Sequence, residues 1–369
     1  MRDEEEDKNS RSAPPSRNEF AFIRRIRRRA LEQLNRIRDP SSFIPHPSSL
    51  ALGIGDDAAV IRQRHGRYTV ITTDLLVEGI DFRLGTTTPW LLGHKALAVS
   101  LSDIAAMGAR PRYALLSIGV PREIWDSDFV DELYDGFFAL ASRYGVALIG
   151  GDVSRTPERI VIDSIILGDV GRELDVRRSG ARPGDHIFVT GALGGAAAGL
   201  RLLERGARLR RRRPHTSNDR AVEQLLLRQL RPEPRVSWGA VLGEEHLATA
   251  MIDLSDGLSS DLRHLCAESR VGALISASRI PVDPPVISLC GRRALDPLLL
   301  ALDGGEDFEL LFTVRPRDLT RLPRRVGDVP VTYIGDITPD TGRIRITEGS
   351  RVWDLEPAGF THFGGRPQK

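Results

Sequence analysis

Lysine and cysteine are scarce in this sequence of 369 residues, although it carries 52 Lys and Arg side chains in total. The lysines are Lys8, Lys95 and Lys369, and none stands in the Gly-Lys-Ser/Thr context of a P-loop. If the protein handles nucleotide phosphates, it does so without a Walker A loop. The two cysteines, Cys266 and Cys290, form no CxxC pair, which argues against a disulfide framework or a cysteine zinc site. This usage is typical of a reducing compartment, so we expect a cytoplasmic protein.

Long apolar runs are also absent. No run approaches the roughly 18 apolar residues that a membrane helix needs, so we expect no membrane association. Residues 1–18 are charged and polar and lack the apolar centre of a secretory signal. Their composition predicts a disordered tail.

Arginine supplies two basic runs, at residues 24–29 and 208–213. Such runs can bind nucleic acid or an acidic partner. No aromatic residue interleaves these arginines, no binding motif accompanies them, and the formal net charge is only +2. We therefore interpret the first run as the solvated face of an amphipathic helix and the second as an exposed insertion, and we expect no nucleic-acid partner.

The first half of the chain alternates between two patterns. Runs rich in β-branched residues predict strands at 68–73, 113–120, 146–151 and 159–170. Helical spacing of apolar residues predicts helices over 88–109, closed by Gly108, and over 126–145, closed by Gly145. Interleaved strands and helices indicate an α/β or α+β fold.

The second half begins after the polar stretch at 171–180, where we place a domain boundary. The predicted elements there are a strand at 186–190, a helix at 258–269, a strand at 272–278 and a half-buried strand within 306–314. The chain is thus divided into a tail (1–18), an N-terminal domain (19–170) and a C-terminal α/β domain (171–369); that the N-terminal domain binds ATP and magnesium and forms a dimer is implied only by the family resemblance described below.

A glycine-rich turn at 189–199 follows a predicted strand and opens a predicted helix, as a dinucleotide fingerprint does. The G-x-G-x-x-G spacing fails, because Leu193 stands where the second glycine belongs. We interpret the small residues as allowing close packing of helices.

Carboxylates stand beside glycine, serine or threonine at the ends of several predicted elements. They are Asp56, Asp57, Asp74, Asp103, Asp152, Asp253, Asp256, Asp261, Asp303, Glu306 and Asp307. Any one of them alone is best explained as a turn or helix cap. Many of them converging without lysine partners would repel one another, and divalent cations stabilise such a cluster.

The residue types around these carboxylates favour one metal. The available ligands are oxygens of Asp, Thr, Ser and the backbone, whereas zinc would require histidine or cysteine. Oxygen ligands favour Mg²⁺, which completes its octahedron with water and substrate phosphates. The sequence therefore indicates an enzyme that uses ATP with Mg²⁺, and Gly150 and Gly151 would let the backbone approach a phosphate.

Nine blocks occur in order along nearly the whole chain. They are GIGDDAAV, TTDLLVEGIDF, KALAVSLSDIAAMGA, LIGGDVSR, RSGARPGD, VTGALGGAAAGL, RPEPRV, IDLSDGLSSDL and GGEDFELLF. With them the sequence resembles the thiamine-monophosphate kinase family, of the superfamily shared with aminoimidazole ribonucleotide synthetase and selenophosphate synthetase. The resemblance implies a two-domain aminoimidazole-ribonucleotide-synthetase-like fold, with N-terminal strands forming a barrel in a homodimer and a C-terminal α/β domain.

The resemblance also implies a role for individual residues. The implied magnesium ligands are Asp57, Thr72, Thr73, Asp74, Asp103, Asp152, Asp253 and Asp256. The implied nucleotide contacts are Gly151, Asp152, Arg178 and Ser255, and the implied contacts to thiamine phosphate are Asp81, Glu306 and Phe360. Asp81 departs from the family pattern, which often has a histidine there. Of the pair in GIGDD, Asp57 is the expected ligand, and Asp56 is expected to hold the glycine turn or a water beside the metal.

The implied reaction is ATP-dependent phosphorylation of thiamine monophosphate to thiamine diphosphate by in-line γ-phosphoryl transfer with several Mg²⁺ ions. The acceptor phosphate is already ionised, so no covalent catalytic residue is expected, and Asp103 and Asp152 would act through the metal. Two alternatives stay open. One is a non-catalytic regulator that binds ATP or thiamine phosphate. The other is a different ATP-using enzyme of the superfamily, although selenophosphate synthetases carry an N-terminal cysteine and this chain has none before Cys266.

Overall fold

The computed structural model describes residues 19–36, 49–63, 66–209, 216–290 and 296–360. The predicted tail, residues 1–18, lies outside the described residues, as does most of the second arginine run. The first arginine run lies on helix α1 (Glu19–Arg36), where Arg24 and Arg25 are exposed. None of the described helices is long and apolar enough to cross a bilayer.

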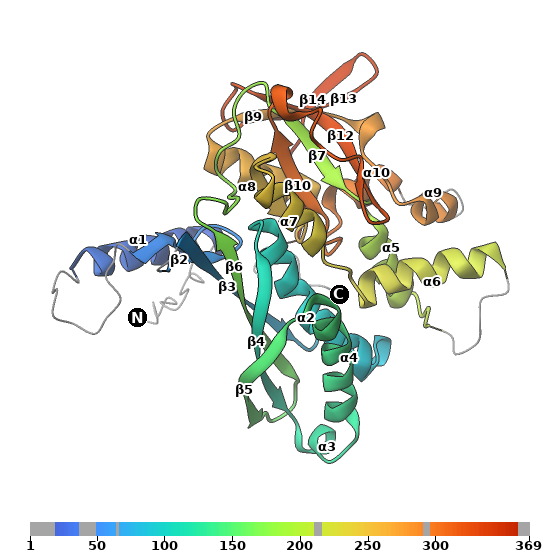
Figure 1. Cartoon of the computed structure of the whole chain (residues 1–369). Coiled ribbons are helices and arrows are strands. Elements are labelled where there is room, and N and C mark those ends of the chain that lie inside the picture. Colours follow the sequence, from blue (N-terminus) through green and yellow to red (C-terminus); the bar gives the residue numbers. More distant parts are fainter. Residues whose placement is uncertain (1–18, 37–48, 64–65, 210–215, 291–295, 361–369) are drawn as a thin grey trace, which may run out of the picture.

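The first half forms a six-stranded sheet in the order β1-β2-β3-β6-β4-β5 (Figure 1). Its strands are β1 (Leu50–Leu52), β2 (Ala59–Arg62), β3 (Arg67–Val77), β4 (Arg110–Val120), β5 (Ala147–Arg155) and β6 (Val161–Gly171). The β3–β6 pair is antiparallel over its full length, from Arg67 opposite Gly171 to Val77 opposite Val161. The short helix α3 (Arg122–Trp125) and helix α4 (Phe129–Tyr144) connect β4 to β5, which run parallel.

Helix α2 (Pro89–Ala106) lies against one face of this sheet and is buried along nearly its whole length. Thr88 begins the helix by accepting a hydrogen bond from the Leu91 backbone, with Pro89 in the first turn. Gly108 follows in the left-handed conformation at φ +66° and ends it, close to the predicted limit. Because α2 is buried on all sides, its polar side chains need partners inside the molecule.

The second half forms a larger sheet in the order β14-β13-β9-β12-β7-β10-β8, with β11 added to β12. Its strands are β7 (His186–Thr190), β8 (Ala248–Asp253), β9 (Gly272–Ser276), β10 (Leu310–Val314), β11 (Arg325–Val326), β12 (Val329–Thr338), β13 (Ile344–Glu348) and β14 (Arg351–Asp354). The accompanying helices are α5 (Gly195–Glu204), α6 (Ser217–Leu230), α7 (Val236–Glu244), α8 (Leu258–Ser269), α9 (Pro284–Cys290) and α10 (Pro297–Asp303). This mixed arrangement confirms the α/β fold class.

The prediction of a half-buried strand within 306–314 is wrong in one respect. Strand β10 is buried at every residue. It lies between β7 and β8, and its alternate side chains enter two different cores: Phe312 joins the core around α2, and Leu311 joins the core around α8. Alternation of apolar and polar residues along a strand indicates a solvent-facing side only where one face of the sheet is open to solvent.

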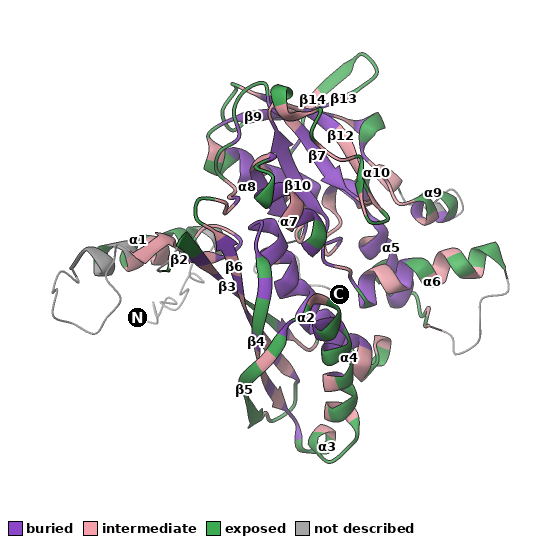
Figure 2. Cartoon of the chain, in the orientation of Figure 1, coloured by how far each residue is buried: buried purple, intermediate pink, exposed green. Residues whose placement is uncertain are grey.

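The two sheets share one hydrophobic core. Helix α7 packs on α2 so closely that a Cβ atom on Gly239 would overlap the backbone of Ala105. Trp238 of α7 and Phe312 of β10 lie in the same core as the buried side of the first sheet. Figure 2 shows α2 buried at this junction and β5 exposed on the far side of the first sheet. The shared core brings the end of α2 next to the end of β8. The division into domains at residue 171 stays a prediction.

Candidate active site

Three carboxylates meet where α2, β8 and the loop after β1 converge. Asp57 comes from the loop, Asp103 from the last turn of α2 and Asp253 from the end of β8, and each offers an oxygen within 4.8 Å of the others. Asp57 and Asp253 are buried. Among the described residues this is the group whose geometry could hold a metal ion.

Hydroxyl side chains on the neighbouring elements hold this cluster in place. The Thr72 hydroxyl of β3 donates to the Asp103 carboxylate at 2.5 Å, and the Ser102 hydroxyl of α2 donates to Asp253 at 2.7 Å. Asp74 lies on the same face of β3 as Thr72, because residues two apart in a strand point to the same side. The predicted metal ligands Asp57, Thr72, Asp74, Asp103 and Asp253 are therefore together.

The cluster has unmet capacity for a cation. The Oδ2 atoms of Asp57 and Asp74 are buried and have no hydrogen-bond partner in the described protein. Burial, together with the neighbouring carboxylates, raises the pKa of Asp74 to about 6 and that of Asp253 to about 8. The same two causes raise the pKa of Asp103 well above its ordinary value. Such a set of crowded oxygens fits a divalent ion of the Mg²⁺ type.

Arg178 is the cation that the structure places at the cluster. Its Nε and Nη2 atoms lie 3.1 Å and 2.5 Å from Asp57 Oδ1. Its backbone N–H donates to Asp56, which also accepts from the Asp57 backbone at 3.1 Å. Asp56 thus holds the turn, as expected for the first aspartate of GIGDD. The role of Arg178 as a nucleotide contact stays a prediction.

Two of the predicted ligands lie on the opposite face of the first sheet. Thr73 points away from the cluster and donates to Asp163 at 2.6 Å. Asp152 on β5 is exposed and shares this open face, since both Asp152 and Asp163 lie opposite Ser117 of β4. Asp152 is therefore not part of the group around Asp103. Asp163 was missed in the sequence, although a carboxylate in the middle of a β-branched run is unusual and was the available signal.

Gly151 has a structural reason to be glycine. Its φ is +151°, and a Cβ atom would overlap the backbone of Leu116 in the neighbouring strand. The close approach of β4 therefore explains why this position is glycine, and contact with a ligand is not needed to explain it. A Cβ atom added to Gly150, by contrast, would meet only the far end of the Leu115 side chain, so there is space beside this glycine.

The loop that follows β8 is tied to the GGEDFEL segment. The Ser255 carbonyl accepts from the Glu306 backbone at 2.8 Å, and the Asp256 backbone donates to the buried Asp261. Helix α8 begins at Leu258, so Ser255 and Asp256 stand before it rather than inside its first turn. Neither belongs to the carboxylate group, and their predicted contacts to nucleotide and metal stay predictions.

A cavity of about 800 Å³ is lined by two of the three predicted substrate residues, Asp81 and Phe360. Phe360 is partly exposed on its wall. The Asp81 carboxylate accepts from the Val77 backbone at 2.8 Å and so closes the turn after β3. Asp81 therefore has a structural role, in addition to any contact with a ligand.

Glu306, the third predicted substrate residue, lies beside this cavity in an ion pair. Lys95 of α2 is buried and places Nζ 2.5 Å from one Glu306 oxygen, and Gln229 of α6 donates to the other. Both Lys95 and Gln229 line the cavity. The expectation of carboxylates without lysine partners is thus wrong at Glu306. The signal was present, because Lys95 is the one lysine inside an apolar helical pattern.

The remaining carboxylates in the GGEDFEL segment and at Asp303 just before it make structural contacts. Asp307 accepts from the backbone N–H groups of Gly194 and Ala196 at the start of α5, and Asp303 accepts from the Ser259 hydroxyl. Glu309 is fully buried and binds Arg235 through both oxygens.

Comparison with known proteins identifies the family to which the chain belongs. The family model described as AIR synthase related protein, N-terminal domain, matches residues 55–170, and the corresponding C-terminal domain matches residues 182–347. The thiamine-monophosphate kinase of Bacillus subtilis is 36% identical over 323 residues, covering 86% of this chain and 95% of the relative. That of Escherichia coli K12 is 40% identical over 320 residues, covering 85% and 92%.

Solved structures show the same relationship. The crystal structure of thiamine-monophosphate kinase from Stenotrophomonas maltophilia is 40% identical, with a TM-score of 0.69 over 89% of this chain and 96% of that one. The structure described as "AaThiL complexed with AMPPCP and TMP" is 30% identical, with a TM-score of 0.74 over 94% and 97%. The hydrogenase maturation protein HypE, at 20% identity and a TM-score of 0.59 over 82% and 91%, shares the fold. The chain belongs to the AIR synthase related proteins and, among them, to the thiamine-monophosphate kinase family.

Proposed function

We propose that this protein transfers the γ-phosphoryl group of ATP to thiamine monophosphate, producing thiamine diphosphate and ADP. The observation that carries the proposal is the buried group of Asp57, Asp103 and Asp253 in a chain that is 36–40% identical to thiamine-monophosphate kinases. The cavity of about 800 Å³ beside Glu306 is of a size that suits a small ligand.

Mg²⁺ fits the donor set of the cluster. Asp57, Asp74, Asp103 and Asp253 would hold it, since two of their oxygens are buried without a protein partner and every available donor is oxygen. When bound, Mg²⁺ would neutralise charge on the phosphates during transfer. Asp256, Thr73 and Asp152 are proposed as further ligands from the resemblance alone.

The protein side chains bind and orient rather than react. The acceptor is a phosphate oxygen that is ionised at neutral pH, so no side chain has to remove a proton from it. Catalysis by this chain then consists of holding two phosphate-bearing substrates in line. Phe360 on the cavity wall offers a ring face to the cationic thiazolium, an attraction of about 0.5–2 kcal/mol.

The nucleotide is proposed to contact Gly151, Asp152, Arg178 and Ser255. Asp152 lies on the open face of the first sheet, opposite Ser117, whereas Arg178 lies at the carboxylate group on the covered face. One nucleotide would have to reach around the sheet edge to meet both. Occupation of the open face by a second copy of the chain would enclose the Asp152 side, so we also propose a homodimer through this face.

Product analysis tests the proposal. The protein is incubated with ATP, Mg²⁺ and thiamine monophosphate, and thiamine diphosphate is quantified by chromatography. We expect stoichiometric formation of thiamine diphosphate and ADP. ATP binding without product would favour the non-catalytic regulator, and product formed from thiamine itself would identify a different kinase. A cytoplasmic location stays a prediction from the sequence.

A further inference from the structure

Glu306 is held from two sides by buried side chains of two different helices. Lys95 of α2 places Nζ 2.5 Å from Glu306 Oε1, and Gln229 of α6 donates from its amide nitrogen to Oε2. Both partners line the cavity of about 800 Å³, and their exposed fractions are only 4% for Lys95 and 5% for Gln229. The Glu306 side chain itself keeps 29% of its surface exposed. The carboxylate therefore stands beside the cavity on two fixed supports.

The backbone of Glu306 is also held in place. Its φ is +64°, in the left-handed region that residues other than glycine rarely adopt. The Glu306 N–H donates to the Ser255 carbonyl at 2.8 Å, and the Phe308 N–H donates to the Leu254 carbonyl at 2.9 Å. Gly305 lies so close to this loop that an added Cβ atom would come 2.5 Å from the Ser255 oxygen. A strained residue of this kind persists where surrounding contacts enforce it, and such residues cluster at ligand sites.

The helices that carry the two partners are tied together. The Nε2 atom of His94 on α2 lies 2.9 Å from the Pro232 carbonyl, just after the end of α6. Helix α6 in turn packs so closely on α5 that a Cβ atom on Gly199 would overlap the Leu225 carbonyl. The support of Glu306 is thus preformed on the helix side as well as on the backbone side, which lowers the cost of ordering it when a ligand binds.

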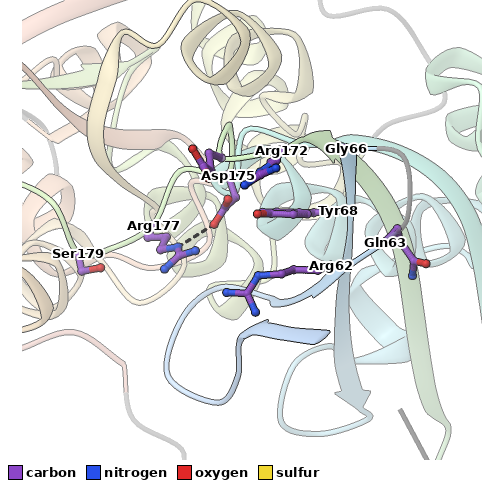
Figure 3. Close-up of a pocket in the computed structure, with 9 residues that line it drawn as sticks. Arg62, Gln63, Gly66, Tyr68, Arg172, Asp175, Arg177 and Ser179 are labelled. Atoms are coloured by element: carbon purple, nitrogen blue, oxygen red, sulfur yellow. Dashed lines mark hydrogen bonds and ion pairs between the residues drawn. The ribbon is translucent and has the colours of Figure 1, made fainter. Parts of the chain in front are cut away.

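Asp175, at a different pocket of about 850 Å³ near the start of β3, provides a contrast (Figure 3). It accepts from Arg177 Nε at 2.7 Å, and this partner lies two residues along the same loop. A contact of this kind forms locally. The partners of Glu306 instead come from α2 in the first half of the chain and α6 in the second, so their convergence depends on the packing of both halves.

Gln229 adds a hydrogen bond without adding charge. The ammonium group of Lys95 already balances the Glu306 carboxylate, and a second cation in place of the amide would leave a net positive charge at the cavity. Each carboxylate oxygen carries two lone pairs, so each can still accept from a ligand after these two bonds are made. The amide of Gln229 therefore fixes the direction in which the remaining lone pairs point.

We propose that Gln229 is a positioning residue for substrate binding: it orients Glu306 so that this carboxylate meets a hydrogen-bond donor of thiamine monophosphate. The inference rests on the proposed function, which supplies the contact between Glu306 and the substrate. Gln229 itself contributes to the affinity for thiamine monophosphate and not to the transfer of the phosphoryl group.

Calorimetric titration of thiamine monophosphate into the full-length protein, with Mg²⁺ and without ATP, tests this role. Gln229→Met removes the amide and keeps the length of the side chain. Gln224→Met, at an exposed position of the same helix, is the matched control. We expect the affinity to fall about tenfold in Gln229→Met, as for one lost hydrogen bond to a charged group, and to be unchanged in the control. In steady-state kinetics the KM for thiamine monophosphate should rise, with kcat and the KM for ATP within about twofold of the wild-type values.

A second variant, Gln229→Glu, reports the hydrogen bond through its pH dependence. The new carboxyl group has nearly the shape of the amide, but it donates to Glu306 only when the two groups share a proton, and two ionised carboxylates there repel each other beside Lys95. We expect the Kd of the variant relative to that of the wild-type protein to be about tenfold higher near pH 8.5 and to approach equality near about pH 6. The ratio cancels the titration of the substrate phosphate, which is common to both proteins.

Unchanged affinity in Gln229→Met would overturn the inference, as would a ratio for Gln229→Glu that does not vary with pH. The second criterion decides the question even if Gln229→Met folds poorly. A wild-type protein that does not bind thiamine monophosphate would overturn it too. Binding without formation of thiamine diphosphate would contradict the proposed kinase, whereas the expected shifts in the two Gln229 variants would still support the positioning role, so the two failures are distinguishable.

Discussion

Asp103 has the most crowded position of the carboxylates in the cluster. It is surrounded by Asp57, Asp74 and Asp253, and Thr72 supplies its hydrogen bond. In the absence of a cation these neighbours destabilise the ionised form of one another. The residue is thus placed for binding a cation rather than for stability of the empty protein.

The substitution Asp103→Asn is therefore expected to separate activity from stability. Turnover should fall about 100-fold or more, because the loss of a charged ligand weakens stabilisation of the transferring phosphate by several kcal/mol. The free energy of unfolding in EDTA should be unchanged or higher, since one repelling charge is removed. Thiamine diphosphate formation and urea unfolding measure the two effects. Near-normal turnover at limiting Mg²⁺ would contradict the assignment of Asp103.

Lys95 provides a second test at the residue scale. Removing it leaves Glu306 beside the cavity without its cation, so Lys95→Met should lower the free energy of unfolding by about 1–3 kcal/mol and raise the KM for thiamine monophosphate. Arg143→Met, which breaks the exposed pair with Glu233, is the matched control and should change stability by less than about 1 kcal/mol. Equal effects in the two variants would argue against a special role for Lys95.

At the scale of elements, the crossing of α2 and α4 holds the first half together. The backbones approach so closely that a Cβ atom on Gly136 would overlap the Trp90 carbonyl, and one on Gly93 would overlap the Leu133 carbonyl. Such mutual glycine contacts fix the position of α2 against α4 and contribute to the placement of Asp103, which lies in the last turn of α2.

Gly136→Ala is accordingly expected to lower the free energy of unfolding by about 1–3 kcal/mol, because backbone atoms cannot yield as a flexible side chain would. Gly85→Ala, at a site where an added Cβ atom would meet nothing within 4 Å, is the control and should be nearly neutral. Thermal or urea unfolding measures both variants. If Gly136→Ala left the free energy of unfolding unchanged, α2 and α4 could move apart without a cost in stability, and the close contact would not be important.

The whole molecule leaves one face of its first sheet open. Leu75 of β3 and Tyr113 of β4 are exposed there, Leu75 at 57%, and Ile149, at the bulge of the edge strand β5, is exposed at 58%. A group of exposed apolar side chains on a sheet with an unpaired edge is typical of an association surface. The proposed homodimer would cover it.

Ile149→Asp is expected to convert the dimer to a monomer, because it buries a charge in the proposed interface. Ile287→Asp on α9, where an isoleucine is exposed to a similar extent, should leave the dimer intact. Light scattering coupled to size-exclusion chromatography distinguishes the two masses. A wild-type protein that elutes as a monomer would rule out the dimer.

The pH dependence of stability is also a property of the whole molecule. The pKa of Asp253 rises from 3.8 to about 8 on folding, first through burial and then through Asp57. Between these values the folded protein binds the proton and the unfolded chain does not, so this group makes the protein less stable as pH rises across that window. Above about pH 8 this group no longer contributes any stability relative to its neutral form.

Asp253→Asn should therefore match the wild-type protein near pH 4 in EDTA, exceed its thermal midpoint progressively up to about pH 8, and keep a constant advantage above that pH. Added Mg²⁺ should reverse the order at high pH, because binding needs the ionised carboxylate. Thermal melts of both proteins over this range, with and without Mg²⁺, measure the effect. A difference that shrinks as pH rises in EDTA would contradict the raised pKa.

The sequence by itself determined the local elements and the chemistry that they carry. The predicted strand at 186–190 and the predicted helix at 258–269 coincide with β7 and α8, because side-chain periodicity and glycine caps are local properties of the chain. The ordered motifs identified the family, and the oxygen donors indicated the type of metal.

Only the tertiary structure decided which of these residues meet. Thr72 and Thr73 are adjacent in sequence, yet strand geometry sends one to the carboxylate group and the other to the open face with Asp152 and Asp163. The partnership of Lys95 with Glu306 spans more than two hundred residues and depends on how α2 packs against the second half. Local patterns indicate which side chains leave an element and in which direction, but which of them meet depends on the packing of elements that are distant in the chain.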